Sequence, residues 1–492
     1  MKQDRSRRDL LRACLVAGAG ASVFGGLGPL TRLAAAAEPG SGKAEAKVKD
    51  RYFLFCYFGG GWDVLLSLDP RDPVLFHEGN VAKHLILPAY DKLKYAPGGG
   101  KPVTAYDWKG DPVLLGPYIG GLAKQFAEKR LSIVRGMSMD TLTHEVGRRR
   151  FLTGKPPSGL LARGSSGATV LASLLGQDQI VPNLAMRVES YNVDQPNYAT
   201  GLKVGSVPDL VRALQPGGVP TATGAGQSSQ GNGAPAGLVL PNSVLAQVDA
   251  LLAQDALCDV AQQSAMWSTA EEARLKARQM VQGGLDGLFD FQAKTPAMEK
   301  LRNYYGIAPT GPGALTQPPA QAAMAVTALT AGVARCVSVT VAESLDTHFE
   351  DWTTLQGPRQ MAAFDLVSKM MDDLASRPFP GSNDSWLDHT TIIGFSEFSR
   401  TPMLNGFMGR DHHLTNSCFV AGAGIQGGRV LGASSDVAMG PQKVDLKTGA
   451  LSAKGEIVKP EHLYMALLHD LGVVGDPDDL RVDPLYALLK KG

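Results

Sequence analysis

Short runs of apolar residues recur along the chain, and each is followed by a polar segment. They lie at residues 51–58, 131–134, 336–341, 390–395 and 418–421. Runs of this length that do not alternate with polar residues are typical of strands buried on both faces of a parallel sheet. We therefore predict five strands of such a sheet at these positions.

Stretches with helical character lie between or after these runs, at 121–128, 321–332, 360–376 and 460–471. The third is amphipathic, and the last begins at Pro460, whose fixed φ suits the first turn of a helix. Strands that alternate with helices predict an α/β fold in which helices cover both faces of the sheet. The predicted fold class is therefore a doubly wound, mostly parallel α/β sheet.

The first 37 residues carry the features of an export signal. Residues 6–12 match the twin-arginine motif, with Leu10 where Phe is commonest, and an apolar stretch at 13–30 and four alanines at 34–37 follow. A transmembrane anchor is the alternative interpretation, but the stretch is short and rich in glycine. We therefore expect residues 1–37 to be a signal peptide that is cleaved after export.

Export of this kind determines where the mature protein works. The twin-arginine translocase usually carries chains that have already folded, often around a cofactor. We therefore expect a periplasmic or extracellular protein that meets this translocase during export and keeps no stable membrane anchor after cleavage.

Composition divides the rest of the chain. Residues 38–50 are polar and charged, as in a linker, and residues 215–237 are an uncharged low-complexity loop of mostly Gly, Ser, Ala, Pro and Gln. Residues 238–315 are rich in helix-forming residues, which predicts a helical insertion or cap. The α/β domain is then expected in two parts, 51–214 and 316–492, of which the second carries most of the candidate metal-site motifs.

The charge balance excludes one class of partner. The chain has 48 Lys and Arg against 47 Asp and Glu, a formal net charge of +1. Proteins that bind nucleic acids usually carry a strongly basic surface. We therefore expect no nucleic-acid partner.

Polar residues with metal-binding or catalytic chemistry follow four of the predicted strands. In open α/β sheets, ligands bind where the carboxyl ends of the strands meet. The residues are Asp63 after the first strand, Asp140, Thr141, Thr143 and His144 after the second, Asp346 and His348 after the third, and Glu397, Arg400, Arg410, Asp411, His412 and His413 after the fourth. Carboxylates mixed with imidazoles favour zinc, manganese or iron over magnesium or calcium. The pattern predicts one or two divalent metal ions at this edge.

Each of these residues also has a purely structural interpretation. Asp63 follows three glycines and fits a turn aspartate, Asp346 fits a helix N-cap, and the pair at 412–413 fits a structural loop. Arg400 and Arg410 are either ion-pair staples of their loop or groups that bind the oxygens of an anion. Their coincidence at the strand ends favours a shared site.

Several motifs together resemble a known family. They are the twin-arginine leader, Gly59-Gly60-Gly61-Trp62-Asp63, Thr143-His144 with Phe151-Leu152-Thr153-Gly154, Asp346-Thr347-His348, and the string from Glu397-Phe398-Ser399-Arg400-Thr401-Pro402 to Gly409-Arg410-Asp411-His412-His413. They are similar to a bacterial twin-arginine-exported family of unknown function in the alkaline phosphatase/sulfatase-like superfamily. The likeness extends from about residue 50 to the C-terminus and is weakest through 215–310.

The resemblance implies an alkaline-phosphatase-like sheet with a bimetal site at the strand ends. It implies hydrolysis of phosphate or sulfate esters through a Ser, Thr or Cys nucleophile. By position, the resemblance implies metal ligands at Asp63, Asp346, His348, Glu397 and His412, with His413 as the alternative to His412. It implies a nucleophile at Thr143 or, less closely, at Thr141. His144, next to Thr143, would be a metal ligand and not the nucleophile.

The chain also departs from the superfamily pattern. Only Thr347 separates Asp346 from His348, where three residues usually intervene, and Phe398 stands where a histidine usually follows the second carboxylate. This leaves the second metal site one ligand short. We predict an exported metal-dependent hydrolase of a small anionic ester, in which Arg400 or Arg410 stabilises charge. The alternative is an exported binding or envelope-associated protein that keeps the fold without turnover.

Overall fold

The computed structural model describes residues 49–156, 163–214 and 283–490, together with residues 247, 276 and 278–280. The predicted signal peptide, the low-complexity loop at 215–237 and most of the linker and insertion lie outside the described residues. The α/β unit comprises residues 41–195, 199–207 and 291–492, and described residues 196–198, 208–214, 247, 276, 278–280 and 283–290 belong to a second unit. The central sheet and the candidate site residues described for it lie in the α/β unit.

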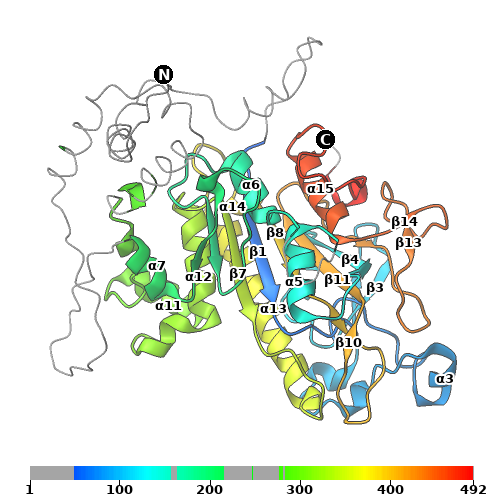
Figure 1. Ribbon diagram of the computed structural model, residues 1–492. Coiled ribbons are helices and arrows are strands. Elements are labelled where there is room, and N and C mark those ends of the chain that lie inside the picture. The colour runs from blue at the N-terminus through cyan, green and yellow to red at the C-terminus, as the bar shows by residue number, and fades with distance from the viewer. Residues whose placement is uncertain are drawn as a thin grey trace, which may run out of the picture. The chain divides into compact units, whose positions relative to one another are not determined.

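An eight-stranded sheet forms the centre of this unit (Figure 1). Its strands, in spatial order, are β12 (Val430–Leu431), β4 (Leu131–Ser138), β11 (Thr415–Gly422), β8 (Thr390–Phe395), β1 (Tyr52–Phe58), β7 (Cys336–Ala342), β5 (Asn183–Met186) and β6 (Leu202–Val204). Only β11 runs antiparallel to its neighbours, β4 and β8, among these eight strands. The other seven strands share one direction, so their carboxyl ends meet at one edge of the sheet.

The five strands predicted from apolar runs are all present. The run at 51–58 becomes β1, and all seven of its residues are buried between β8 and β7. The run at 390–395 becomes β8 with the predicted limits. The mixed α/β class and the mostly parallel sheet are therefore confirmed. The short strands β5 and β6, which the apolar pattern did not reveal, extend the sheet beyond β7.

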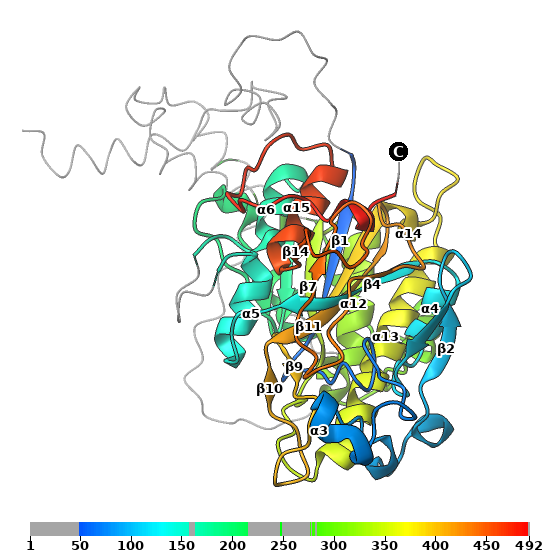
Figure 2. The same ribbon diagram turned by 90° about the vertical axis from the view of Figure 1, so that its right-hand side faces the viewer.

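Helices cover both faces of the sheet, and Figure 2 shows the strands between the two layers. One layer contains α4 (Leu122–Ala127), α11 (Pro296–Tyr305), α12 (Pro318–Thr330), α13 (Gly357–Ser376) and α14 (Trp386–His389), and the other contains α5 (His144–Thr153), α6 (Gly167–Leu175) and α15 (Pro460–Asp470). Side chains of β1 alternate between the layers. Phe58 packs on Phe364 of α13, and Phe55 stacks on Tyr464 of α15. The four predicted helices correspond to α4, α12, α13 and α15.

Smaller elements line the edge where the seven strands end and the periphery of the unit. They are α3 (Val81–His84), the hairpin of β2 (Val103–Tyr106) and β3 (Pro112–Leu115), the hairpin of β9 (Ser399–Arg400) and β10 (His412–His413), the pair β13 (Lys443–Val444) and β14 (Glu456–Ile457), and the π-turn at Trp352–Gln356 that leads into α13. Within the described residues, no helix combines the length and the apolar character that crossing a membrane requires.

Candidate metal centre

The carboxyl-end edge of the sheet brings together side chains that follow three strands, β4, β7 and β8. His144 is the first residue of α5, which follows β4, and Asp346 and His348 lie in the loop after β7. Arg400 in β9 pairs with His412 in β10, so the hairpin after β8 places these two residues opposite each other. The convergence predicted from strand ends is therefore present for these five residues.

One oxygen of Asp346 is the focus of the cluster. The Nε2 atoms of His348, His412 and His144 lie 2.9, 3.3 and 3.4 Å from Asp346 Oδ1. The Nε2 atoms of His348 and His412 lie 3.0 Å from each other. His144, Asp346 and His412 each offer one ligand atom, and these three atoms lie within 4.8 Å of one another. These three residues therefore offer a shared set of ligand atoms, and His348 adds an imidazole nitrogen beside Asp346 and His412.

The hydrogen bond that each ring makes through Nδ1 determines where its proton lies. It therefore also determines whether Nε2 carries a lone pair. Each Nδ1 lies at hydrogen-bond distance from an oxygen that can only accept, so Nδ1 carries the proton. The acceptors are Glu397 Oε1 for His144 (2.8 Å), Asp411 Oδ1 for His348 (2.8 Å) and the backbone oxygen of Leu142 for His412 (2.6 Å). Neutral rings bonded in this way present Nε2 as a ligand atom, the arrangement found around protein-bound metals.

The separations between the ligand atoms fit a metal ion. Lone pairs that face one another repel; the Arg400 guanidinium offsets this repulsion at Asp346 Oδ1 and His348 Nε2, and a metal ion would offset it at all of the ligand atoms. Two ligand atoms of a tetrahedral zinc ion, each about 2.0 Å from the metal, lie about 3.3 Å apart. The distances from Asp346 Oδ1 to the three Nε2 atoms and from His348 Nε2 to His412 Nε2, four of the six separations in the set, span 2.9 to 3.4 Å. The donor set of imidazoles with one carboxylate also suits zinc, manganese or iron.

Arg400 supplies positive charge from the buried side of the cluster. Its Nη2 donates to Asp346 Oδ1 at 2.5 Å, and its Nη1 lies 3.3 Å from His348 Nε2. Partial burial alone would raise the pKa of Asp346, but the hydrogen bond and charge of Arg400 outweigh it and lower this pKa to about 2. Burial also lowers the pKa of His412, which favours the neutral, metal-binding ring. The Arg400 side chain is fully buried, so its charge influences the site through Asp346 and His348.

Glu397 holds His144 and is not among the converging ligand atoms. Its side chain is buried, and Oε1 accepts from His144 Nδ1 and from the Gly60 amide at 2.9 Å. Its Oε2 accepts from the Ser396 hydroxyl at 2.9 Å. Burial would raise the pKa of Glu397, but these donors, led by His144, lower it. Glu397, expected as a metal ligand, therefore serves as an ionised orienting partner.

Asp63 and Arg410 form a buried ion pair. Arg410 Nε lies 3.1 Å from Asp63 Oδ2, and both side chains are fully buried. The indole of Trp352 donates to Asp63 Oδ2 at 2.8 Å, and the Leu65 amide donates to Asp63 Oδ1 at 3.0 Å. The other nitrogens of Arg410 donate to backbone carbonyls, including that of Thr401 at 2.6 Å. Asp63, expected as a ligand, and Arg410, expected as an anion clamp, therefore contact each other and the surrounding chain, and the structure does not bring them to the cluster.

Phe398 stands at the position where the superfamily resemblance predicts a histidine. Its buried ring stacks on His412 with centroids 4.1 Å apart and lies 4.7 Å from the ring of His144. Gly61 lies against Phe398, since a Cβ there would come within 2.5 Å of the Phe398 ring. Gly60, at φ +108, lies equally close to the backbone of Asp346. The glycine run thus lets the first loop pass beneath the cluster, and an apolar ring supports two imidazoles.

The remaining candidates lie around the cluster in different roles. Thr143 is exposed at the N-cap of α5, directly before His144, and no hydrogen bond of its hydroxyl was found among the described residues. Its amide donates to the Thr141 hydroxyl at 3.3 Å. His413 points to the other side of the hairpin from His412, where its Nε2 lies 3.1 Å from the Ala438 carbonyl. His413 therefore does not supplement His412, and burial lowers its pKa.

Two contributors to the site were not anticipated. The carbonyl of Leu142 fixes the ring of His412, and a backbone acceptor leaves no trace in residue type. Asn405 donates to the His348 carbonyl at 2.9 Å and to Asp411 Oδ1 at 3.1 Å. Its position before Gly406 within the motif from 397 to 413 was the available signal, since Asn-Gly marks a turn whose side chain bonds nearby backbone.

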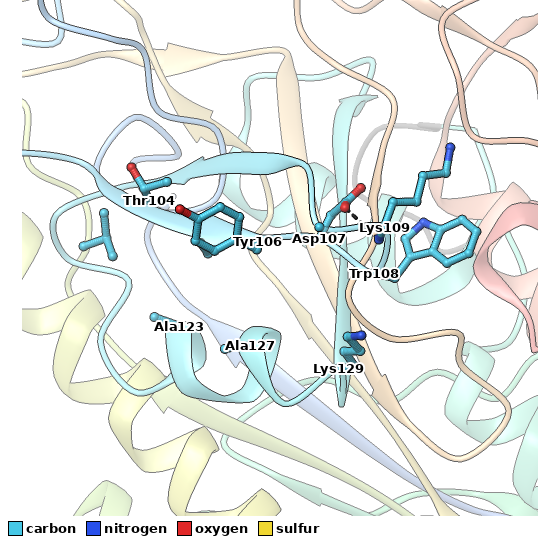
Figure 3. Close-up of a pocket in the computed structure, with 11 residues that line it drawn as sticks. Thr104, Tyr106, Asp107, Trp108, Lys109, Ala123, Ala127 and Lys129 are labelled. Atoms are coloured by element: carbon cyan, nitrogen blue, oxygen red, sulfur yellow. Dashed lines mark hydrogen bonds between the residues drawn. The ribbon is translucent and has the colours of Figure 1, made fainter.

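A cavity of about 560 Å³ lies elsewhere in the unit. It is lined by residues 103–110 of the β2–β3 hairpin and by Ala123, Ala127 and Lys129 at α4 (Figure 3). None of the predicted site residues lines it. The candidate chemistry is therefore at the strand ends and not in this cavity.

Comparison with known proteins adds one finding. A family model described as "Protein of unknown function (DUF1501)" matches residues 121–459. This range contains the cluster residues His144, Asp346, His348, Arg400 and His412. A search of curated proteins gave no match.

Proposed function

Because the chain belongs to the DUF1501 family of proteins of unknown function, we propose its activity from the site itself: an exported, metal-dependent hydrolase of small phosphate or sulfate esters. The single observation that carries the proposal is the convergence of three imidazole Nε2 atoms on Asp346 Oδ1. In this proposal His144, Asp346, His348 and His412 hold one divalent ion, for which zinc, manganese or iron is the best match.

The residues around the cluster would have different roles in ester hydrolysis. A metal ion bound there supplies Lewis-acid polarisation of an ester oxygen. Thr143, exposed at the N-terminus of the ten-residue helix α5, is the proposed nucleophile. The free amides at this helix end favour a negatively charged group next to Thr143. Arg400 keeps Asp346 ionised, and Glu397 holds the ring of His144.

The resemblance to the alkaline phosphatase/sulfatase-like superfamily supports the same proposal. The strand-end position of the cluster is the position that the superfamily uses. Phe398 and the engaged Asp63 argue for one metal ion in place of two. We propose this fold relationship together with the activity.

Export through the twin-arginine pathway is part of the proposal. Replacement of Arg7 and Arg8 by lysine should keep the chain in the cytoplasm, while the unchanged chain reaches the periplasm. Cell fractionation of both forms is the measurement. Equal export of the two forms would exclude the twin-arginine pathway as the export route.

A second function has one observation in its favour. Four protein ligands complete a tetrahedral site, and such closed sites are usually structural, whereas catalytic zinc sites keep one position open. The four ligand atoms of His144, Asp346, His348 and His412 fulfil that count. On this alternative the protein is an exported binding or envelope-associated protein that holds its metal without turnover.

A substrate panel separates the two functions. The mature, metal-loaded protein is assayed with aryl phosphates, phosphodiesters and aryl sulfates, with and without a chelator. Turnover that the chelator and His412→Ala both abolish supports the hydrolase. If no substrate of the panel is turned over by protein that still holds its metal, the result supports the alternative of a binding protein.

A further inference from the structure

Two phenylalanines stand exposed beside the candidate metal centre. Phe349 directly follows His348 and is 61% exposed, and Phe407 in the loop between β9 and β10 is 67% exposed. Their ring centroids lie 5.6 Å apart at an interplanar angle of 55°. Two loops that are far apart in the sequence thus present one apolar surface next to charged and polar groups.

The loop that carries Phe407 is fixed to a proposed metal ligand. Asn405 Oδ1 accepts from the amides of Phe407 (2.9 Å) and Gly409 (3.1 Å). Asn405 Nδ2 donates to the carbonyl of His348 (2.9 Å) and to Asp411 Oδ1 (3.1 Å). All four hydrogen-bonding positions of this amide are used. The position of Phe407 is therefore coupled to that of His348.

The backbone of the same loop is held in a costly conformation. Met408 adopts a left-handed φ of +63°, which is unfavourable for a residue with a side chain. A Cβ at Gly409 would collide with the carbonyl of His348, so only glycine permits this approach. Tertiary contacts maintain this geometry, and they hold the Phe407 loop against the backbone of His348.

We propose that Phe349 and Phe407 bind the apolar part of the substrate, an aromatic or bulky alkyl group of the phosphate or sulfate ester. This inference rests on the proposed function, because it places the charged end of the same ester at His348 and its neighbours. A flat ring gains both apolar burial and favourable ring contacts from two phenylalanines.

Two phosphonates that resist hydrolysis test the inference. Binding of phenylphosphonate and of methylphosphonate to the zinc-loaded mature protein is measured by calorimetry. We expect the phenyl compound to bind about tenfold more tightly. The preference should disappear in Phe349→Ala/Phe407→Ala and weaken in Phe407→Ala alone. It should persist in Tyr106→Ala, which removes an exposed ring of the β2–β3 hairpin.

The outcomes separate this inference from the proposed function. If the protein binds zinc and both phosphonates equally, or if the phenyl preference survives in the double variant, the aromatic surface has no substrate role and the hydrolase proposal stands. If neither phosphonate binds to zinc-loaded protein, both proposals fall. If the double variant changes the oligomeric state by size-exclusion chromatography and wild type shows no phenyl preference, the two rings form a contact between copies of the chain. Zinc content and circular dichroism of the variants establish that they are folded.

Discussion

His348 and His412 face each other through Nε2 atoms that lie 3.0 Å apart. The Nδ1 atom of each ring donates to an oxygen, so two neutral rings would bring two lone pairs together. A shared proton or a metal ion between them removes the repulsion. Because Asp346 Oδ1 lies within 3.3 Å of both nitrogens, a divalent cation satisfies the arrangement better than a single proton.

The first prediction concerns metal content. Purified mature protein should contain about one transition metal ion per chain, and His348→Ala and His412→Ala should each lose most of that metal, because each removes a ligand. Elemental analysis after dialysis is the measurement. His413→Ala is the matched control, since its ring bonds the backbone of Thr415 and Ala438. Wild-type metal content in both ligand variants would refute the site.

The second prediction separates an orienting carboxylate from a ligand. Glu397→Gln keeps the shape of the buried side chain but removes the charge that holds His144. Loss of such a partner typically weakens metal binding by about 10- to 100-fold without emptying the site. Competition with a chelator measures the affinity. Glu461→Gln is the control, because Glu461 is also buried but pairs with Arg150 at 2.6 Å. An unchanged affinity in Glu397→Gln would show that His144 needs no such partner.

The strands of this fold could be predicted where burial alone determines them. Residues 390–395 are apolar or threonine throughout, and β8 has the predicted limits because both its faces are covered. Strand β5 (Asn183–Met186) was missed because it has four residues and begins with Asn183, so its burial comes from pairing with β7. Helix α5 was missed because its sequence shows three arginines, while its packing depends on Phe151 stacking on Phe395.

The location of the candidate site could be predicted from the sequence, but the role of each residue in it was harder to predict. Strand ends and residue types identified Asp346, His348 and His412, because the parallel sheet brings those ends together. Sequence does not reveal which way a side chain turns after a glycine run, so Asp63 was expected among the ligands although it turns to Arg410. His144 was only an alternative, because its role depends on the hydrogen bond from Nδ1 to Glu397.

The third prediction tests the role of the buried ion pair. Asp63→Asn should lower the free energy of unfolding by about 3–5 kcal/mol, because it leaves the fully buried Arg410 without its partner. The metal content per folded chain should stay at the wild-type level. Urea denaturation and elemental analysis of the same sample are the measurements.

The double variant Asp63→Asn/Arg410→Met provides the control for the ion pair. Because it removes both charges, it should be less destabilised than the sum of the two single variants. If Asp63→Asn loses metal and keeps its stability, Asp63 is a ligand and the structural role is wrong.

The last prediction concerns stability as a function of pH and uses a carboxylate away from the cluster. Asp478 has a side chain only 3% exposed, and burial raises its pKa to about 6 in spite of Lys155 at 3.4 Å. Between the ordinary pKa of an unfolded aspartate, about 3.9, and about 6, the folded state binds more protons than the unfolded state. The contribution of Asp478 to the free energy of unfolding is therefore fully present below that range. It is lost as the pH rises through 6, and the total loss is about 3 kcal/mol. Asp478→Asn cannot ionise, so its free energy of unfolding should improve relative to wild type between pH 4 and pH 7. Chemical denaturation of both proteins at several pH values measures the difference, and a difference that stays constant with pH would show that Asp478 ionises normally in the folded protein.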